Sequence, residues 1–270
     1  MATRVRVAVL GVGSLGRQHA RIYGEMHRQG AVELVGVYDT DDALAKAIAA
    51  KHSTVALDSV EDAAGAADAF SIVTPTVTHH ALAKPLLEQG KHLLVEKPMT
   101  DHADRAAELV RLAKRHDCVL QVGHIERFNP VFQYLREAAR EPRFIESHRL
   151  SPFPARSMDI GVVLDLMIHD LDIVLAFVRS PVEQVDAAGV RVLSDSEDIA
   201  NARLRFANGC VANLTVSRVS PESLRKIRVF SGGDVIPAHG VNESHYRAAV
   251  AFLNSFDHVL VLCALDELYM

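Results

Sequence analysis

Three glycines in one short stretch are the first residues whose spacing suggests a chemical role. Gly11, Gly13 and Gly16 follow the apolar run at residues 5–10 and match the pattern G-x-G-x-x-G. Between a strand and a helix, such glycines permit a tight turn, let backbone N–H groups approach a pyrophosphate, and allow the helix to pack closely on the strand. The stretch therefore predicts a dinucleotide site, although glycines that merely form a turn are the alternative. The residues expected to line the site are Gly11, Val12, Gly13, Ser14, Leu15 and Gly16.

Asp39 stands at the end of the next apolar run, where a carboxylate can accept hydrogen bonds from both hydroxyls of a ribose. Asp41 and Asp42 add negative charge beside it, and no arginine stands next to them to receive a 2′-phosphate. We therefore expect NAD rather than NADP as the cofactor. The alternative for Asp39 is a loop carboxylate that lies in solvent.

Two later segments, TPTVTHH at residues 74–80 and VEKPM at 95–99, also follow apolar runs. The carboxyl ends of parallel strands meet at the edge where ligands bind, so we expect these segments to lie beside the glycine turn. A lysine in a partly enclosed cleft can act as a proton partner, whereas a solvated surface lysine is the alternative. The residues expected at this edge are Thr74, Pro75, His79, Glu96 and Lys97.

The segment DLMIHDLD at residues 165–172 places charged side chains within an apolar helical pattern. Asp165, His169 and Asp172 have the spacing i, i+4 and i+7, which predicts one face of a helix. Charged groups on a buried face need partners or a ligand. The alternatives to an active site are a metal held by the histidine and two carboxylates, or a core histidine with a capping aspartate.

Residues 1–124 alternate between short apolar runs and helical patterns, which predicts a doubly wound parallel sheet, the Rossmann fold of α/β proteins. The expected strands are Val5–Leu10, Glu33–Tyr38, Phe70–Val73, His92–Val95 and Val119–Gly123. The expected helices lie at residues 14–30, 41–52, 79–90 and 101–117. We expect Asp101 to cap the last helix and Pro85 to shorten or kink the third.

From residue 125 onward the pattern indicates an α+β domain with a mainly antiparallel sheet. Residues 129–142 predict a helix with Asn129 as its cap, and residues 162–178 predict a strongly apolar helix. Alternating runs, with a tight turn at Asn208-Gly209, predict the sheet. These runs lie at residues 143–150, 182–193, 199–219 and 225–233. We place this domain at residues 125–270, with an atypical tail from about residue 233.

Composition excludes several classes of protein. The 270 residues are 49% hydrophobic and carry a formal net charge of −5, so a nucleic-acid partner is not expected. No apolar run reaches the length of a membrane span. The three cysteines are widely spaced and form no C-x-x-C pair, which favours a reducing cytoplasm over a disulfide framework or a zinc site.

Four motifs together resemble the Gfo/Idh/MocA family of NAD(P)-dependent oxidoreductases over about residues 4–232. They are GVGSLGRQHA, TPTVTHHALA, GKHLLVEKPM and DLMIHDLD, in the family's order. The resemblance implies that Lys97 lies beside the nicotinamide, that Asp165 and His169 lie at the substrate, and that no metal is needed. Met167 stands where the family commonly has glycine, so we expect a more regularly helical backbone there.

A finer resemblance is to the bacterial UDP-N-acetylglucosamine 3-dehydrogenases, which oxidise a ring hydroxyl before an aminotransferase installs nitrogen for lipid A. It is carried by QVGHIERFNP, IESHRLSPF and VVLDLMIHDLDIVL. The diphosphate of such a substrate suits guanidinium groups, and Arg127, Arg149 and Arg156 lie in the segments that flank the apolar helix. Solvation at the surface is the alternative for each arginine.

We therefore expect an NAD-dependent dehydrogenase, acting on a UDP-sugar, that assembles as a homodimer or homotetramer. His169, or His169 together with Lys97, would take the hydroxyl proton, and Asp165 would orient the imidazole. Two alternatives stay open: a dehydrogenase of a free sugar or inositol, and a non-catalytic sensor that binds the dinucleotide.

Overall fold

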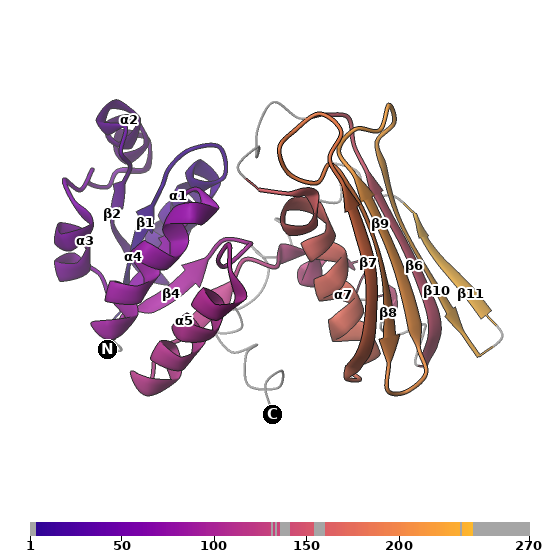
Figure 1. Ribbon diagram of the computed structural model, residues 1–270. Coiled ribbons are helices and arrows are strands. Elements are labelled where there is room, and N and C mark those ends of the chain that lie inside the picture. The colour runs from indigo at the N-terminus through magenta and orange to yellow at the C-terminus, as the bar shows by residue number, and fades with distance from the viewer. Residues whose placement is uncertain are drawn as a thin grey trace. The chain divides into compact units, whose positions relative to one another are not determined.

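The computed structural model describes residues 4–130, 132, 134, 135, 141–153, 160–232 and 234–239, the last range for its backbone alone. The described chain forms two compact units, one that ends at Gly123 and one that starts at His124 (Figure 1). Each unit contains one sheet and its own hydrophobic core.

The first unit is built on a five-stranded parallel sheet with the order β2-β1-β3-β4-β5. Its strands are β1 (Val5–Leu10), β2 (Val32–Tyr38), β3 (Ala69–Ile72), β4 (His92–Val95) and β5 (Leu120–Val122). Each lies within one residue of the strand expected at that place. The predicted Rossmann sheet is confirmed.

Helices cover both faces of this sheet. They are α1 (Gly16–Arg28), α2 (Asp42–His52), α3 (Val60–Ala66), α4 (Thr76–Glu88) and α5 (Ala103–Arg115). Alternate residues of β1 point to opposite faces: Val9 joins a core with Ala20 and Ala49 of α1 and α2. Leu10 joins a core with residues of α3, α4 and α5, among them Leu86 and Leu109.

One local expectation in this unit is wrong, and a second, that Pro85 shortens or kinks its helix, is wrong in its first part. Asp101 does not cap α5, because both of its carboxylate oxygens accept hydrogen bonds from Nη1 of Arg105, at 2.9 and 3.0 Å. Pro85 does not shorten its helix: α4 starts earlier than expected and continues to Glu88. The missing N–H of Pro85 is outweighed because the next two residues, Leu86 and Leu87, are fully buried in the core.

The second unit contains a six-stranded sheet with the order β11-β10-β6-β9-β8-β7. Its strands are β6 (Pro142–Leu150), β7 (Val182–Val190), β8 (Ile199–Phe206), β9 (Val211–Ser217), β10 (Leu224–Ser231) and β11 (Asp234–His239). All neighbours pair antiparallel except β6 and β9, which are parallel. The sheet is therefore mainly antiparallel, as expected, with one parallel pair at its centre.

The helix α7 (Ile168–Val178) packs along one face of this sheet (Figure 1). The inward residues of β8 and β9, such as Ala202 and Leu214, form a core with Val174 and Val178 of α7. A short 3-10 turn, η1 (Ile125–Phe128), also belongs to this unit.

Several expectations fall on residues outside the described part of the chain. Of the helix expected at 129–142, the structure describes Asn129, Pro130, Phe132, Tyr134 and Leu135, and the last four are helical. Of the tail, residues 234–239 extend the sheet as β11, and residues 240–270 are not described. Among the described helices, none has the length and hydropathy needed to cross a membrane.

Candidate active site

The glycine turn joins β1 to α1. The physical reason why a glycine is needed differs among its three glycine positions. Gly11 has φ +85°, and a Cβ there would lie 2.7 Å from the carbonyl oxygen of Val73. A Cβ at Gly16 would lie 1.9 Å from the carbonyl oxygen of Gly11. These two glycines are therefore required by the fold itself.

At Gly13, by contrast, the fold itself does not require a glycine. Apart from Gly13 and its two chain neighbours, no heavy atom of the described residues lies within 4 Å of the point where its Cβ would stand. The first turn of α1 contains no acidic side chain, so the positive end of that helix is available to an anion. An open position in front of a helix N-terminus fits the pyrophosphate of a dinucleotide.

Asp39 lies at the carboxyl end of β2, next to this turn. Its Oδ2 accepts a hydrogen bond of 2.7 Å from the backbone N–H of Val12, and its Oδ1 accepts one of 3.1 Å from Asp41. The carboxylate is only partly buried, so each oxygen can accept a further hydrogen bond from a ribose hydroxyl. Asp41 itself caps α2 by accepting from the N–H of Leu44.

His79 ties together the two loops that follow β3 and β4. Its Nε2 lies 2.8 Å from the carbonyl oxygen of Thr74, and its Nδ1 lies 3.0 Å from that of Pro98. The ring is 1% exposed, so it lies beneath the loops rather than on their surface. His79 therefore holds Thr74 and the Lys97-Pro98 segment in place, and the direct cofactor contact expected from the sequence stays a prediction.

Glu96 is buried beside Lys97 and belongs to a polar chain that the sequence did not reveal. Its Oε1 lies 3.1 Å from Nε2 of His19, whose Nδ1 lies 2.7 Å from Oγ of Ser71. A Cβ at Gly123 would lie 2.6 Å from Oε1 of Glu96, so that glycine makes room for the carboxylate. His19 stands in the glycine-rich motif itself, which is the one signal that pointed to it.

Tyr23 lies in the next turn of α1, where it is partly buried. Burial raises the pKa of Tyr23 to about 12, against the opposing effect of its hydrogen bond with Ser71. The phenol therefore stays neutral near pH 7 and acts as a hydrogen-bonding group.

In the second unit, Asp165 lies in a π-helical turn, η2 (Val163–Met167), that leads directly into α7. The backbone N–H of Ile168 donates to the carbonyl of Val163, five residues earlier. The expectation of a more regular helix around Met167 is therefore wrong. The wider turn changes the rotation between Asp165 and His169, both of which are partly buried.

Two of the three arginines expected at a diphosphate form ion pairs with carboxylates of α7. Nε of Arg127 donates to both oxygens of Asp172, at 3.0 and 2.8 Å. Nε and Nη2 of Arg149 donate to the two oxygens of Asp170, at 3.0 and 3.1 Å. Arg156 lies outside the described residues.

Arg149 is deeply embedded in this arrangement. Its side chain is 8% exposed, and Glu126 lies 3.5 Å from its Nη1. Burial by itself lowers the pKa of Arg149, but the charge and hydrogen bonds of Asp170 raise it. The guanidinium is therefore permanently charged and occupied by protein carboxylates. Asp170 was not among the expected site residues, because its spacing resembles that of any helical carboxylate.

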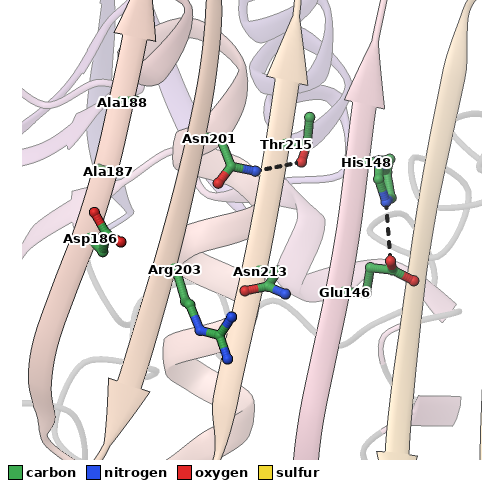
Figure 2. A pocket seen from close by; sticks show the side chains of 9 residues that line it. All are labelled: Glu146, His148, Asp186, Ala187, Ala188, Asn201, Arg203, Asn213 and Thr215. Carbon is green, nitrogen blue, oxygen red and sulfur yellow. Dashed lines mark hydrogen bonds and ion pairs between the residues drawn. The ribbon is translucent and has the colours of Figure 1, made fainter.

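The opposite face of the six-stranded sheet carries a polar hollow of about 440 Å³ (Figure 2). Its lining alternates in sequence with the core residues of the same strands, so it lies on the side away from α7. The polar residues around it are Glu146, His148, Asp186, Asn201, Arg203, Asn213 and Thr215. Among the described residues, no group of three or more His, Cys, Asp or Glu is arranged to hold a metal ion.

Both units of the chain are similar to known proteins. Residues 5–124 match the model of an oxidoreductase family with an NAD-binding Rossmann fold, and residues 133–232 match the GFO/IDH/MocA C-terminal domain. A UDP-N-acetylglucosamine 3-dehydrogenase of Acidithiobacillus ferrooxidans is 41% identical over 94% of this chain and 76% of its own. The myo-inositol dehydrogenase Hyg17 of Streptomyces leeuwenhoekii is 32% identical over 80% of this chain and 70% of its own.

The solved structure of the Acidithiobacillus ferrooxidans enzyme, GnnA, superposes with a TM-score of 0.81. It is 37% identical and covers 93% of this chain and 88% of its own.

Proposed function

The chain belongs to the GFO/IDH/MocA family of NAD-binding oxidoreductases, and from this membership we propose that it oxidises the C3 hydroxyl of UDP-N-acetylglucosamine. The product is a 3-keto sugar nucleotide, formed with NADH and a proton. The observation that carries the substrate is the 41% identity, over 94% of the chain, to a UDP-N-acetylglucosamine 3-dehydrogenase.

The first unit holds the cofactor in this proposal. The open position at Gly13 and the N-terminus of α1 support a pyrophosphate there. Asp39 accepts hydrogen bonds from the adenosine ribose hydroxyls while it holds the N–H of Val12. Thr74, Pro75 and Glu96 shape the neighbouring edge, and His79 supports it from beneath. When bound, NAD supplies the hydride acceptor.

Lys97, Asp165 and His169 carry the proton chemistry. Lys97 polarises the substrate oxygen, and His169 accepts the hydroxyl proton as the C3 hydrogen leaves with its electron pair. Asp165, in the π-helical turn that leads into α7, orients the imidazole of His169. The C–H and O–H bonds break, a carbonyl forms, and the proton is released from His169 to water.

We assign both Arg127 and Arg149 a supporting role, which for the buried Arg149 takes the place of direct contact with a diphosphate. Their ion pairs with Asp172 and Asp170 support the view that they fix the rotation of α7, and thereby His169. Arg127 is about one-third exposed, so its outer edge is compatible with an additional phosphate contact. Arg156 stays a candidate for the diphosphate.

A panel of substrates tests this proposal. The protein is incubated with NAD and one of UDP-N-acetylglucosamine, UDP-glucose, free N-acetylglucosamine, glucose or myo-inositol, and NADH absorbance is followed. An aminotransferase with glutamate removes the ketone and pulls the reaction forward. We expect a response to UDP-N-acetylglucosamine and none to the free sugar, because the remote nucleotide supplies binding energy that positions the ring.

Oxidation of inositol is the second candidate, and the 32% identity to a myo-inositol dehydrogenase favours it. Turnover of myo-inositol without any response to nucleotide sugars would select it. A non-catalytic sensor is a third candidate, but a sensor needs the glycine turn and has no use for Lys97, Asp165 and His169. NAD binding with no turnover of any substrate would select the sensor.

We also propose that the protein assembles as a dimer or tetramer through the polar face of the six-stranded sheet. The hollow of Figure 2 exposes Asp186 and Arg203, charges of both signs that a second copy can pair. Light scattering of the wild type and of Arg203→Glu tests this.

We further propose a cytoplasmic location, on the basis of cysteine usage. We also propose that the protein supplies a 3-keto sugar to an aminotransferase of lipid A synthesis.

A further inference from the structure

The first backbone N–H groups of the helical segment that carries Asp165 and His169 form hydrogen bonds with Glu197, in the loop before β8. The backbone N–H of Val162 donates to the carbonyl of Glu197 at 2.9 Å. The backbone N–H of Val163 donates to Oε1 of the same residue at 3.2 Å. The first N–H groups of a helix have no partners within the helix, so Glu197 satisfies two of them and places a negative charge at the positive end.

Gly161 leaves the space that this carboxylate occupies. A Cβ at Gly161 would lie 1.9 Å from Oε1 of Glu197 and 2.2 Å from its Cδ. Gly161 does not have a positive φ, so glycine is needed here for room and not for an unusual backbone conformation. The carbonyl of Gly161 in turn accepts the N–H of Asp165 at 3.0 Å. Gly161 thus packs against the Glu197 carboxylate and also accepts a hydrogen bond from Asp165.

A buried ion pair fixes the loop that presents Glu197. Arg218 is fully buried, and its Nε donates to Oδ1 of Asp198 at 2.8 Å. Its Nη1 donates to the carbonyl of Ile160 at 2.9 Å, immediately before Gly161. Arg218 therefore binds both the loop and the residue that precedes the helix.

Asp198 completes this support. Its Oδ2 accepts the backbone N–H groups of Val192, Leu193 and Ser194 at 2.7 to 3.0 Å. Burial opposes ionisation of Asp198, but hydrogen bonds from Ser194 and Arg218 lower its pKa well below the ordinary value. The carboxylate stays charged, and the loop at residues 191–198 has a fixed shape.

We propose that Glu197 is a positioning residue for Asp165 and His169, because it determines where their helix begins and so preserves the π-helical turn. The π turn holds one residue more than an α-helical turn would. If this turn became α-helical, the angle between Asp165 and His169 about the helix axis would change, because an α-helical residue advances by about 100° and a π-helical residue by less. The catalytic part of this inference rests on the proposed function.

Four variants test the proposal: Glu197→Gln, Glu197→Ala, Gly161→Ala and the double variant Gly161→Ala/Glu197→Ala. Glu183→Ala, at an exposed position of β7, is the matched control. We expect Glu197→Ala to lower kcat on the order of tenfold or more while the Kd for NAD is unchanged. Glu197→Gln keeps an acceptor oxygen for Val163 and recovers most of the rate.

The glycine variants give an independent prediction. Gly161→Ala alone lowers kcat, because the new methyl group displaces the Glu197 carboxylate. The double variant is no worse than Glu197→Ala, since the clash is gone. The proposal is overturned if Glu197→Ala keeps the wild-type kcat, or if the losses of the two single variants multiply in the double variant.

Amide hydrogen exchange separates this inference from the proposed function. In Glu197→Ala we expect faster exchange at Val163 and Ile168, the amides of the helix start and the π turn, with unchanged exchange in α5. If the wild type oxidises no substrate, the proposed function fails, and exchange alone decides the positioning role. Unchanged exchange at Ile168 would then reject it.

Discussion

The carboxylate of Asp39 accepts a hydrogen bond of 2.7 Å from the backbone N–H of Val12, which connects the end of β2 to the glycine turn. Asp39 therefore shapes the turn and also presents a negative charge beside it. These two effects can be separated, because an asparagine keeps an oxygen acceptor but has no charge.

We expect Asp39→Ala to weaken NAD binding on the order of tenfold, by loss of the ribose acceptor and of the Val12 anchor. We expect Asp39→Asn to keep more of the NAD affinity and to bind NADP better than the wild type does. Fluorescence titration with both cofactors measures this. Equal affinity of the wild-type protein for NAD and NADP would contradict the assigned role of Asp39.

The catalytic assignment predicts the effect of two further changes. His169→Ala and Lys97→Met should each lower kcat by about 10² to 10⁴, the usual contribution of a general base or acid. The Kd for NAD of His169→Ala should stay at the wild-type value, since His169 lies in the second unit. Normal turnover by both variants would show that the proton leaves by another route.

His79 contacts the loops that follow both β3 and β4, and we call this pair of contacts the His79 clamp. Loss of the clamp should lower the stability of the protein. His79→Phe removes at least one ring N–H that donates to the carbonyl of Thr74 or of Pro98 in a buried place, which costs about 1–3 kcal/mol for an unsatisfied group. Urea unfolding should show the loss, and NAD binding should weaken with it. His102→Ala, at an exposed position, is the control. Wild-type stability of His79→Phe would refute the clamp.

The buried pair of Arg149 and Asp170 predicts a thermodynamic signature. Arg149→Met alone leaves a buried carboxylate without its main partner and should lower the free energy of unfolding by about 3–5 kcal/mol. Replacing Asp170 with leucine in the same chain should recover most of the loss. If Arg149 instead gripped a diphosphate, Arg149→Met would raise the KM for the UDP-sugar with little effect on unfolding.

The raised pKa of Tyr23 implies that the free energy of unfolding falls at high pH. Its pKa is raised to about 12 in the folded protein, above the value of about 10 in an unfolded chain. The resulting stabilisation is complete below about pH 10 and is lost as the pH rises toward 12. Urea unfolding between pH 8 and pH 11 should show a smaller decline in Tyr23→Phe than in the wild type. An identical decline in both would contradict the shift.

The sequence predicted the first unit closely, because both faces of a parallel sheet are buried and its strands appear as continuous apolar runs. Val5–Leu10 and His92–Val95 match the expected strands at both ends. The capping role expected for Asp101 was wrong, because one nearby side chain, Arg105, competes for its carboxylate. A pattern of residue types does not predict whether a carboxylate will bind a neighbouring side chain or the backbone at the start of a helix.

The site in the second unit was harder to predict, since it depends on partners far apart in the chain. Arg127 and Asp172 are 45 residues apart, and Glu197 and Val163 are 34 apart. The expectation of a regular helix also failed at Met167, where the structure has a π-helical turn. The motif pointed to Asp165 and His169 as candidates, and the folded chain shows which residues surround their helix.

Transfer of deuterium from C3 decides whether the protein catalyses the proposed oxidation. UDP-N-acetylglucosamine that carries deuterium at C3 is incubated with the protein and NAD, and the NADH is analysed by mass spectrometry. We expect deuterated NADH together with a 3-keto sugar nucleotide, and a slower reaction in Lys97→Met and His169→Ala. NADH without deuterium, or deuterium retained in the sugar while NADH forms, would contradict it.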